Sequence, residues 1–254
     1  MQVPRSKLFI TGNCLDQLQD AMQSKPDALS IDLEDGVEAP HKAHARESVS
    51  NFLRSNRLPC QVWVRINGLN SSHLVSDILA LASAHVDLIN LPKTESASDL
   101  QVLEQLLSHI EAVEGIGRRI RIVPTIESAR GLKNAYQIGA ASPRVLALQL
   151  GAGDLAMSTG IDRLGNGLDF IRTSISLAAA EAGIVALDST PHGMNDLASF
   201  EADALKARSF GFRGKSCMLP AHVSLANRIF GDAQTTAHLD RSDGLKERSL
   251  ARQC

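Results

Sequence analysis

Residues 87–115, DLINLPKTESASDLQVLEQLLSHIEAVEG, contain the pattern that decides the fold. The segment starts with a short apolar run, DLINLPK, which has the length and composition of a buried strand. A helical pattern follows at 98–113, where apolar residues recur at three- and four-residue spacing: Leu100, Leu103, Leu106, Leu107 and Ile110. Ser96 and Asp99 form a capping box before this helix, and Gly115 is a stop signal after it. The segment therefore predicts one strand–turn–helix unit.

The same order of elements recurs along the whole chain. Short apolar runs followed by helical patterns occur at 7–12, 28–34, 61–67, 87–93, 120–127, 145–154, 183–189 and 214–220. Strands that are apolar on both faces and alternate with helices favour a parallel sheet. An open doubly wound sheet is the alternative, but the phosphate-binding glycine fingerprint is missing after the first strand.

Eight such units in 254 residues match the size of a (β/α)₈ barrel. We therefore predict an α/β protein with an eight-stranded parallel TIM barrel. Residues 1–230 form the catalytic domain in this prediction. Residues 231–254 are polar and poorly patterned, and we expect them to form a C-terminal tail.

Composition excludes several classes of partner. A net charge of −2 gives no reason to expect nucleic acid or an anionic membrane surface. The longest apolar runs are too short to span a bilayer, and the N-terminus lacks a signal-peptide layout. Four scattered cysteines without a CxxC pair are typical of reduced thiols, so we expect a cytoplasmic protein.

The carboxyl ends of the predicted strands supply the candidate site, because these ends line the active-site mouth of a TIM barrel. The polar residues at these positions are Asp32, Glu34, Asp35, Arg65, Asn67, Lys93, Glu127, Asp154 and Asp188, with His192 just beyond. Acidic and basic groups that converge from separate strands predict a site that binds a cation together with an anionic substrate.

Glu127 and Asp154 are the candidate metal ligands. They follow neighbouring strands in PTIESARG and LQLGAGDLA, and the small residues 151–153 leave room beside them. Mg²⁺ commonly takes one or two protein carboxylates and completes its octahedron with water and substrate oxygens. The alternative is that each carboxylate caps the helix that follows it.

Arg65 ends an apolar strand and needs an anionic partner, which is either a substrate carboxylate or the acidic cluster at 32–35. Lys42 and Arg46 lie one turn apart on the next helix, where we expect them to neutralise that cluster. Lys93 is either another ion-pair partner or a desolvated amine that forms a Schiff base with a carbonyl substrate.

A series of motifs runs in order from Arg5 to about Pro220: RSKLFITG, DLEDGVEAPHKAHAR, VRIN, LPKTES, TIESARGLKNAYQIGAASPRV, LGAGDLA, AAEAGIVALDS and ARSFGFRGKSCMLP. Taken together they resemble the HpcH/HpaI aldolase/citrate lyase family, and in particular its citrate lyase beta-subunit-like branch. The resemblance covers nearly the whole chain and implies a TIM barrel, bound Mg²⁺ and chemistry at a carbon–carbon bond next to a carbonyl.

The resemblance also assigns roles to residues. It implies that Glu127 and Asp154 hold the metal and that Arg65 holds a substrate carboxylate or carbonyl. The other catalytic residues implied are Glu34, Asp32 and Asp35, beside the metal waters, and Lys42, which pairs with them. We assign substrate contacts to Asn67, Gly153 and Asp188 as well. Family members are commonly trimers or hexamers, so we expect a homo-oligomer, with homotrimer as the first choice.

The predicted function is a Mg²⁺-dependent carbon–carbon lyase or aldolase that acts on a 2-oxo or 2-hydroxy carboxylate or its acyl thioester. One alternative is a Schiff-base aldolase using Lys93, and another is a non-catalytic ligand-binding barrel subunit. Two features depart from the branch. The last strand runs into MLPAH, with Leu219 where the family has a histidine, and the C-terminal segment is shorter than a lid. Both count against a coenzyme A substrate and leave the general acid or base unassigned.

Overall fold

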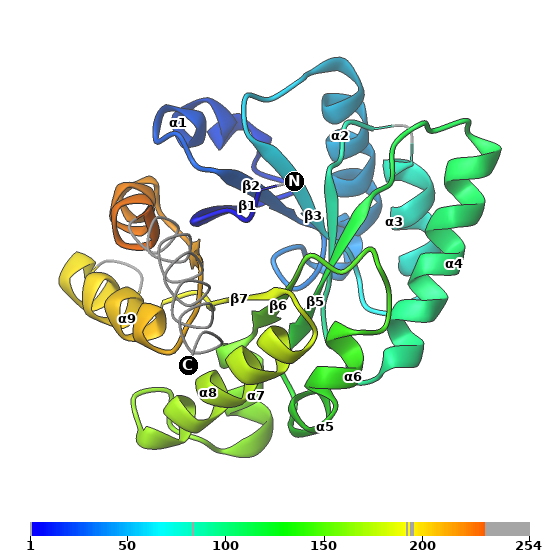
Figure 1. The fold of residues 1–254 in the computed structure, drawn as a ribbon. Helices are drawn as coiled ribbons and strands as arrows, with labels where there is room; N and C mark the ends of the chain where they lie inside the picture. The colour runs from blue at the N-terminus through cyan, green and yellow to red at the C-terminus, as the bar shows by residue number, and fades with distance from the viewer. Residues whose placement is uncertain (1, 83, 192, 194–195, 232–254) are drawn as a thin grey trace, which may run out of the picture.

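The computed structural model describes residues 2–82, 84–191, 193 and 196–231. Eight parallel strands form one sheet, in the order β7-β6-β5-β4-β3-β2-β1-β8. The strands are β1 (Ser6–Thr11), β2 (Ala28–Asp32), β3 (Gln61–Arg65), β4 (Leu88–Leu91), β5 (Arg121–Ile126), β6 (Ala147–Leu150), β7 (Val185–Leu187) and β8 (Lys215–Cys217). Figure 1 shows the strands around the centre of the molecule and the helices outside them.

The first and last strands of this order are joined as well. The N–H of Asp188, just after β7, donates to the carbonyl of Gly214 at 2.8 Å. The N–H of Ser216 on β8 donates back to the carbonyl of Asp188 at 3.1 Å, and Asp188 and Lys215 form a parallel bridge. These bonds close the sheet into a barrel, so the predicted TIM-barrel fold is confirmed.

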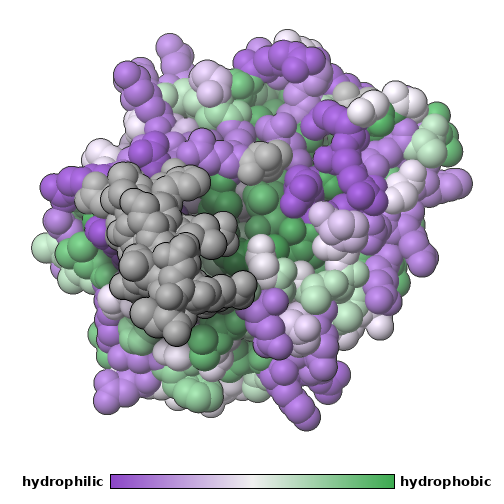
Figure 2. Space-filling model, viewed as in Figure 1, coloured by the Kyte–Doolittle hydropathy of each residue, from purple (hydrophilic) through white to green (hydrophobic). Residues whose placement is uncertain are grey.

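Helices follow the strands in the predicted alternation. The elements are η1 (Leu15–Gln17), α1 (Leu18–Gln23), η2 (Ala39–His41), α2 (Lys42–Ser55), α3 (Leu74–Leu81), α4 (Ala97–Val113), α5 (Ala129–Lys133), α6 (Ala135–Gly139), α7 (Ala152–Thr159), α8 (Asn166–Glu181) and α9 (Leu197–Ser209). A further helix occupies 220–231. Hydrophilic residues cover much of the face shown in Figure 2, with apolar residues visible between them.

Residues 87–115, the strand–turn–helix unit that predicted the fold, have the expected capping box and stop signal. Helix α4 begins after Ser96, whose hydroxyl accepts from the N–H of Asp99, while the Asp99 carboxylate accepts from the N–H of Ser96. Leu100, Leu103 and Leu107 are fully buried, because they lie on the helix face that packs against the barrel. The predicted stop signal, Gly115, adopts a φ of +65°, a conformation that favours glycine.

The inside of the barrel changes from apolar to polar along the strands. One set of inward-facing residues forms a separate buried apolar cluster: Ala28, Trp63, Leu88, Val123, Ala147 and Leu187. Side chains two positions further along a strand face the same side. At those positions the barrel carries Ser30, Arg65, Asn90, Thr125, Gln149 and Ser189. The strands therefore place an apolar plug at one end and polar groups toward their carboxyl ends.

Some expectations concern residues outside the described part of the chain. These are His192 and the predicted tail, of which only Gly231 is described. Within the described residues, no helix combines the length and hydropathy needed to span a bilayer.

Candidate active site

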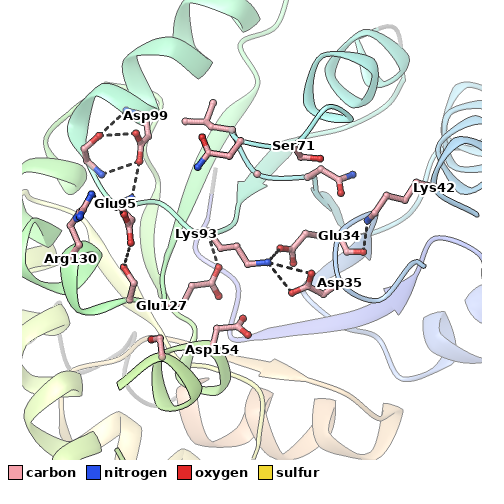
Figure 3. Close-up of a pocket in the computed structure, with 17 residues that line it drawn as sticks. Glu34, Asp35, Lys42, Ser71, Lys93, Glu95, Asp99, Glu127, Arg130 and Asp154 are labelled. Atoms are coloured by element: carbon pink, nitrogen blue, oxygen red, sulfur yellow. Dashed lines mark hydrogen bonds and ion pairs between the residues drawn. The ribbon is translucent and has the colours of Figure 1, made fainter. Parts of the chain in front are cut away.

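Two adjoining cavities lie at the carboxyl ends of the strands. The outer cavity has a volume of about 820 Å³, and the inner cavity about 100 Å³. Glu127 and Asp154 line both, so they lie where the two cavities meet. Figure 3 shows the charged side chains around the outer cavity, among them Glu34, Asp35, Lys42, Lys93 and Arg130.

Glu127 and Asp154 approach each other from neighbouring strands. Glu127 follows β5, and Asp154 lies in the first turn of α7, which follows β6. The N–H of Lys93 donates to Glu127 Oε1 at 2.5 Å. Burial, together with the adjacent carboxylates of Asp154 and Glu34, raises the pKa of Glu127 to about 8, against the Lys93 hydrogen bond. A cation between Glu127 and Asp154 would relieve this repulsion.

The donor set fits Mg²⁺. Among the described residues, no group of three or more His, Cys, Asp or Glu side chains gathers as a metal cage. Mg²⁺ needs only one or two carboxylates, because water and substrate oxygens fill its remaining positions. The helix-cap alternative fails for Glu127, since Ser128 is the N-cap of α5 and its hydroxyl accepts from the N–H of Gly131 at 3.0 Å.

Gly151 makes room for the Glu127 carboxylate. A Cβ at this position would overlap the side chains of Glu127 and Thr125. Gly153, which we predicted as a substrate contact, lines the inner cavity, and a Cβ there would lie in ordinary contact distance, 3.8 Å, of Arg163 Nη1. Gly151 is therefore the glycine that the position of Glu127 requires, and the substrate contact of Gly153 stays a prediction.

Arg65 lies beside this pair and is already held by two carboxylates. Its Nε and Nη2 donate to the two Asp32 oxygens at 2.7 Å each, and its Nη1 lies 2.9 Å from Glu34 Oε2. Burial opposes the charge of Arg65, but Asp32 and Glu34 outweigh it and raise the pKa of the guanidinium. Burial likewise opposes ionisation of Asp32, but Arg65 and the N–H groups of Glu34 and Gly36 hold its pKa below the usual range. The internal ion pair is thus present, and Arg65 still lines the inner cavity.

Lys93 continues the same charge network. Its Nζ lies 2.6 Å from Glu34 Oε1 and 3.1 Å from Asp35 Oδ2. Burial opposes protonation, but the hydrogen bonds and charges of Glu34 and Asp35 prevail and raise the pKa of Lys93. A lysine held in its protonated form is not a nucleophile, so the structure argues against a Schiff base at Lys93. Lys93 has a φ of +52°, which is unusual for a residue other than glycine. In this conformation its N–H donates a hydrogen bond to Glu127.

The predicted pairing of Lys42 and Arg46 with the acidic cluster is wrong. Lys42 Nζ donates to the carbonyls of Leu33 and Glu34, at 3.0 and 2.9 Å. Arg46 Nε donates to Asp77 at 2.7 Å. Both residues lie on the helix that follows the acidic cluster, as predicted. Lys42, however, reaches main-chain oxygens, and Arg46 reaches the neighbouring helix α3.

Asn67 is fixed by structural contacts. Its side-chain nitrogen donates to the carbonyl of Leu33 at 3.0 Å and to Asp77 Oδ2 at 2.6 Å. The amide lines the outer cavity while its N–H groups hold neighbouring segments together. Its predicted substrate contact therefore stays a prediction.

Asp188 is not part of either cavity, and its predicted substrate contact is wrong. It is fully buried and pairs with Lys215 and with Arg172, whose Nη2 lies 3.0 Å away. Leu187 and Ser189 face into the barrel, so Asp188 between them faces the surrounding helices. The alternation of side chains along the strand excludes it from the site.

A model of the HpcH/HpaI aldolase/citrate lyase family matches residues 5–220. The chain belongs to this family. The chain is 33% identical to the citrate lyase subunit beta of Haemophilus influenzae over 240 residues, which cover 92% of this chain and 82% of that protein. It is 31% identical to the L-malyl-CoA/beta-methylmalyl-CoA lyase of Rhodobacter capsulatus, over 89% of this chain and 78% of that protein.

A solved structure agrees with this membership in the HpcH/HpaI family. The citrate lyase beta subunit of M. tuberculosis, complexed with oxaloacetate and magnesium, superimposes with a TM-score of 0.73 at 27% identity. The match covers 89% of this chain and 96% of that one. A metal-dependent carbon–carbon lyase with Mg²⁺ as cofactor is the function that these relatives support.

Two polar residues of this family member were missed by sequence reasoning. Lys7 on β1 and Gln149 on β6 line the inner cavity, and Lys7 Nζ donates to Gln149 Oε1 at 2.8 Å. The signal was available, because a lysine begins the largely apolar run KLFITG. Reading the carboxyl ends of the strands alone overlooks inward-facing residues that come earlier in a strand.

Proposed function

We propose that this chain is a Mg²⁺-dependent lyase that cleaves or forms a carbon–carbon bond next to a carbonyl. Its substrate is a 2-oxo or 2-hydroxy carboxylate or the corresponding acyl thioester. The observation that carries the proposal is the approach of Glu127 and Asp154 beside Arg65, where the two cavities meet. The outer cavity of about 820 Å³ has the size of a small-molecule site, which suits a larger thioester group.

Glu127 and Asp154 would hold Mg²⁺ through one or more carboxylate oxygens. The ion supplies Lewis-acid polarisation of a substrate carbonyl when it is bound. Arg65 directs its remaining N–H groups at the oxygen on which negative charge develops as the bond breaks. Asp32 and Glu34 keep the guanidinium charged and fixed in orientation, so little reorganisation is needed during the reaction.

Lys93 and Asp35 form the edge of the same site. Lys93 bridges Glu34 and Asp35, while its N–H fixes one Glu127 oxygen. Asp35 is the most exposed of the three acids at 32–35, with 57% of its side chain accessible. Proton transfer to solvent or substrate at this edge would therefore fall to Asp35 rather than to the enclosed Asp32.

The test compares Glu127→Gln and Asp154→Asn with Asp169→Asn, which removes a carboxylate paired with Lys206 on the outer helices. Mg²⁺ binding is measured by calorimetry. Turnover is measured with oxaloacetate, pyruvate, acetoacetate and acyl-coenzyme A thioesters. Glu127→Gln and Asp154→Asn should lose metal binding, and their rates should fall at least 100-fold. Asp169→Asn should keep both. Near-normal rates in both would refute the ligand assignment. Ligand binding without turnover by the wild type would favour the non-catalytic barrel.

We also propose that the chain self-associates as a trimer or hexamer. Four large apolar side chains on α7, α8 and the loop between them are 65–78% exposed: Met157, Leu164, Phe170 and Leu177. Large exposed apolar groups gathered on neighbouring elements are typical of interfaces. Light scattering on the wild type and on Phe170→Asp tests this, and a monomeric wild type would contradict it.

The cytoplasm is the compartment we propose. The three described cysteines, Cys14, Cys60 and Cys217, are all free thiols. Free thiols persist in reducing compartments. Fractionation of cells with an antibody to the protein would test this assignment.

A further inference from the structure

Lys7 is a buried cation that the proposed chemistry leaves without a role. The residue is 2% exposed and faces the inside of the barrel from β1. Its Nζ lies 4.7 Å from the centre of the Phe9 ring and 5.3 Å from that of Trp63, with Gln149 as its hydrogen-bond acceptor. Among the described residues, Lys7 forms no ion pair. Burying an unpaired ammonium is costly, so the position requires an explanation.

Gln149 orients this ammonium. Its Nε2 donates to the main-chain carbonyls of Leu150, Leu187 and Asp188, at 3.1, 3.2 and 2.7 Å. These three acceptors fix the amide, so that its oxygen faces Lys7 at 2.8 Å. A lysine ammonium has three N–H donors. One is used by Gln149, which leaves two for the aromatic faces and the inner cavity.

Lys7 and Arg65 line the same cavity but differ in the groups that they contact. Arg65 is neutralised by Asp32 and Glu34, whereas the partner of Lys7 is a neutral amide. Burial, together with the positive charge of Arg65, lowers the pKa of Lys7 to about 7. A bound anion would supply the missing countercharge and restore full protonation.

We propose that Lys7 Nζ, oriented by Gln149, binds a second carboxylate of the substrate on the floor of the inner cavity. The enzyme then prefers dicarboxylic 2-oxo or 2-hydroxy acids over monocarboxylic ones. This inference rests on the proposed function for the other end of the substrate, which lies between Glu127, Asp154 and Arg65. The cavity of about 100 Å³ equals roughly three waters at about 30 Å³ each, which suits a carboxylate on a short chain.

The test measures binding of L-malate and L-lactate, two 2-hydroxy acids that differ by one carboxylate. Calorimetric titrations with Mg²⁺ use the wild type, Lys7→Met and Lys7→Gln. The wild type should bind malate more tightly than lactate. Both variants should lower malate affinity by about 10- to 100-fold, the usual loss for a charge-assisted hydrogen bond, and leave lactate affinity within about twofold. Lys7→Gln keeps a polar group opposite Gln149, so it removes the charge without leaving the Gln149 oxygen unpaired.

Lys206→Met is the matched control, because this lysine pairs with Asp169 on the outer helices. It should change neither affinity. Equal losses for malate and lactate in the Lys7 variants, or no loss for malate, would overturn the proposal. So would a borohydride-stable adduct of oxaloacetate on Lys7, since that outcome assigns covalent chemistry to the amine.

Titrations repeated without Mg²⁺, alongside turnover assays, separate this inference from the proposed function. A difference between malate and lactate that depends on Lys7 supports the subsite whether or not turnover is found. Metal-independent binding of both acids with no turnover would count against the lyase assignment alone.

Discussion

Arg65 and Asp32 are directly paired residues of neighbouring parallel strands, and their side chains form a bidentate ion pair with two contacts of 2.7 Å. The register of β2 and β3 therefore sets where the guanidinium lies relative to the cavity. Two parallel hydrogen bonds fix its plane as well as its position.

Asp32→Asn should lower kcat by about 10- to 100-fold with a smaller effect on KM, because Arg65 loses the partner that orients it. Steady-state kinetics on the best substrate provides the measurement. Asp27→Asn is the control: Asp27 makes a similar bidentate pair with Arg5, at 2.7 and 2.8 Å, near the amino ends of the strands. Equal losses of kcat in both variants would show that general stability, and not orientation of Arg65, is responsible.

Gly151→Ala should weaken Mg²⁺ binding by at least about 10-fold, because the new methyl group displaces the Glu127 carboxylate. Calorimetric titration with Mg²⁺ measures the change. Gly153→Ala, two residues away and with only an ordinary contact to a Cβ, should bind the ion as the wild type does. Unchanged binding in Gly151→Ala would mean that Glu127 is not a ligand.

Lys7→Met should stabilise the fold near neutral pH, with a gain that shrinks as the pH rises. Burial and the charge of Arg65 lower the pKa of Lys7 to about 7, against the charges of Cys217, Asp32 and Glu127. Above about pH 7 the unfolded chain keeps a proton on Lys7 that the folded chain loses, so this residue makes wild-type stability rise with pH by up to about 1.4 kcal/mol per unit. The methionine variant lacks this contribution.

Urea unfolding of the two proteins at several pH values between about 7 and 9 measures that difference. The pKa of Glu127, raised by burial to about 8, contributes a slope of opposite sign to both proteins, so the comparison uses their difference. A stability difference that stays constant over this range would contradict the expected titration of Lys7.

Asp188→Asn should destabilise the protein by about 3–5 kcal/mol, because Arg172 and Lys215 then share the single carboxylate of Asp203. Chemical denaturation measures the loss. Malate and Mg²⁺ affinities of the folded variant should match those of the wild type. A selective loss of substrate affinity with unchanged stability would restore Asp188 to the binding site.

The order of elements and the approach of Glu127 to Asp154 could be predicted because they depend on local pattern and on strand order. The capping box at Ser96 and Asp99 and the stop at Gly115 act within a few residues, and both are present. Glu127 and Asp154 meet because they follow neighbouring strands of a parallel barrel. Such relations follow from topology once the strands are identified.

The wrong predictions concern the direction in which a side chain points, which a sequence shows less clearly than the order of elements. Asp188 stands at a strand end but faces outward, since Leu187 and Ser189 face inward. Lys42 has the reach to meet a carboxylate, yet it donates to two main-chain carbonyls that also require partners. Which acceptor a long side chain chooses depends on three-dimensional competition, which spacing does not record.

The apolar plug that includes Trp63 and Leu88 is 0–2% exposed and blocks the barrel at the amino ends of its strands. A molecule held beside Lys7 therefore leaves toward the carboxyl ends of the strands, and one route lined by described residues runs past Glu127 and Asp154 into the outer cavity. After cleavage, a fragment in the outer cavity stands in this route and obstructs the fragment beneath it. The route thus favours an order of product release, which product-inhibition patterns would display as competitive for the inner fragment and noncompetitive for the outer one.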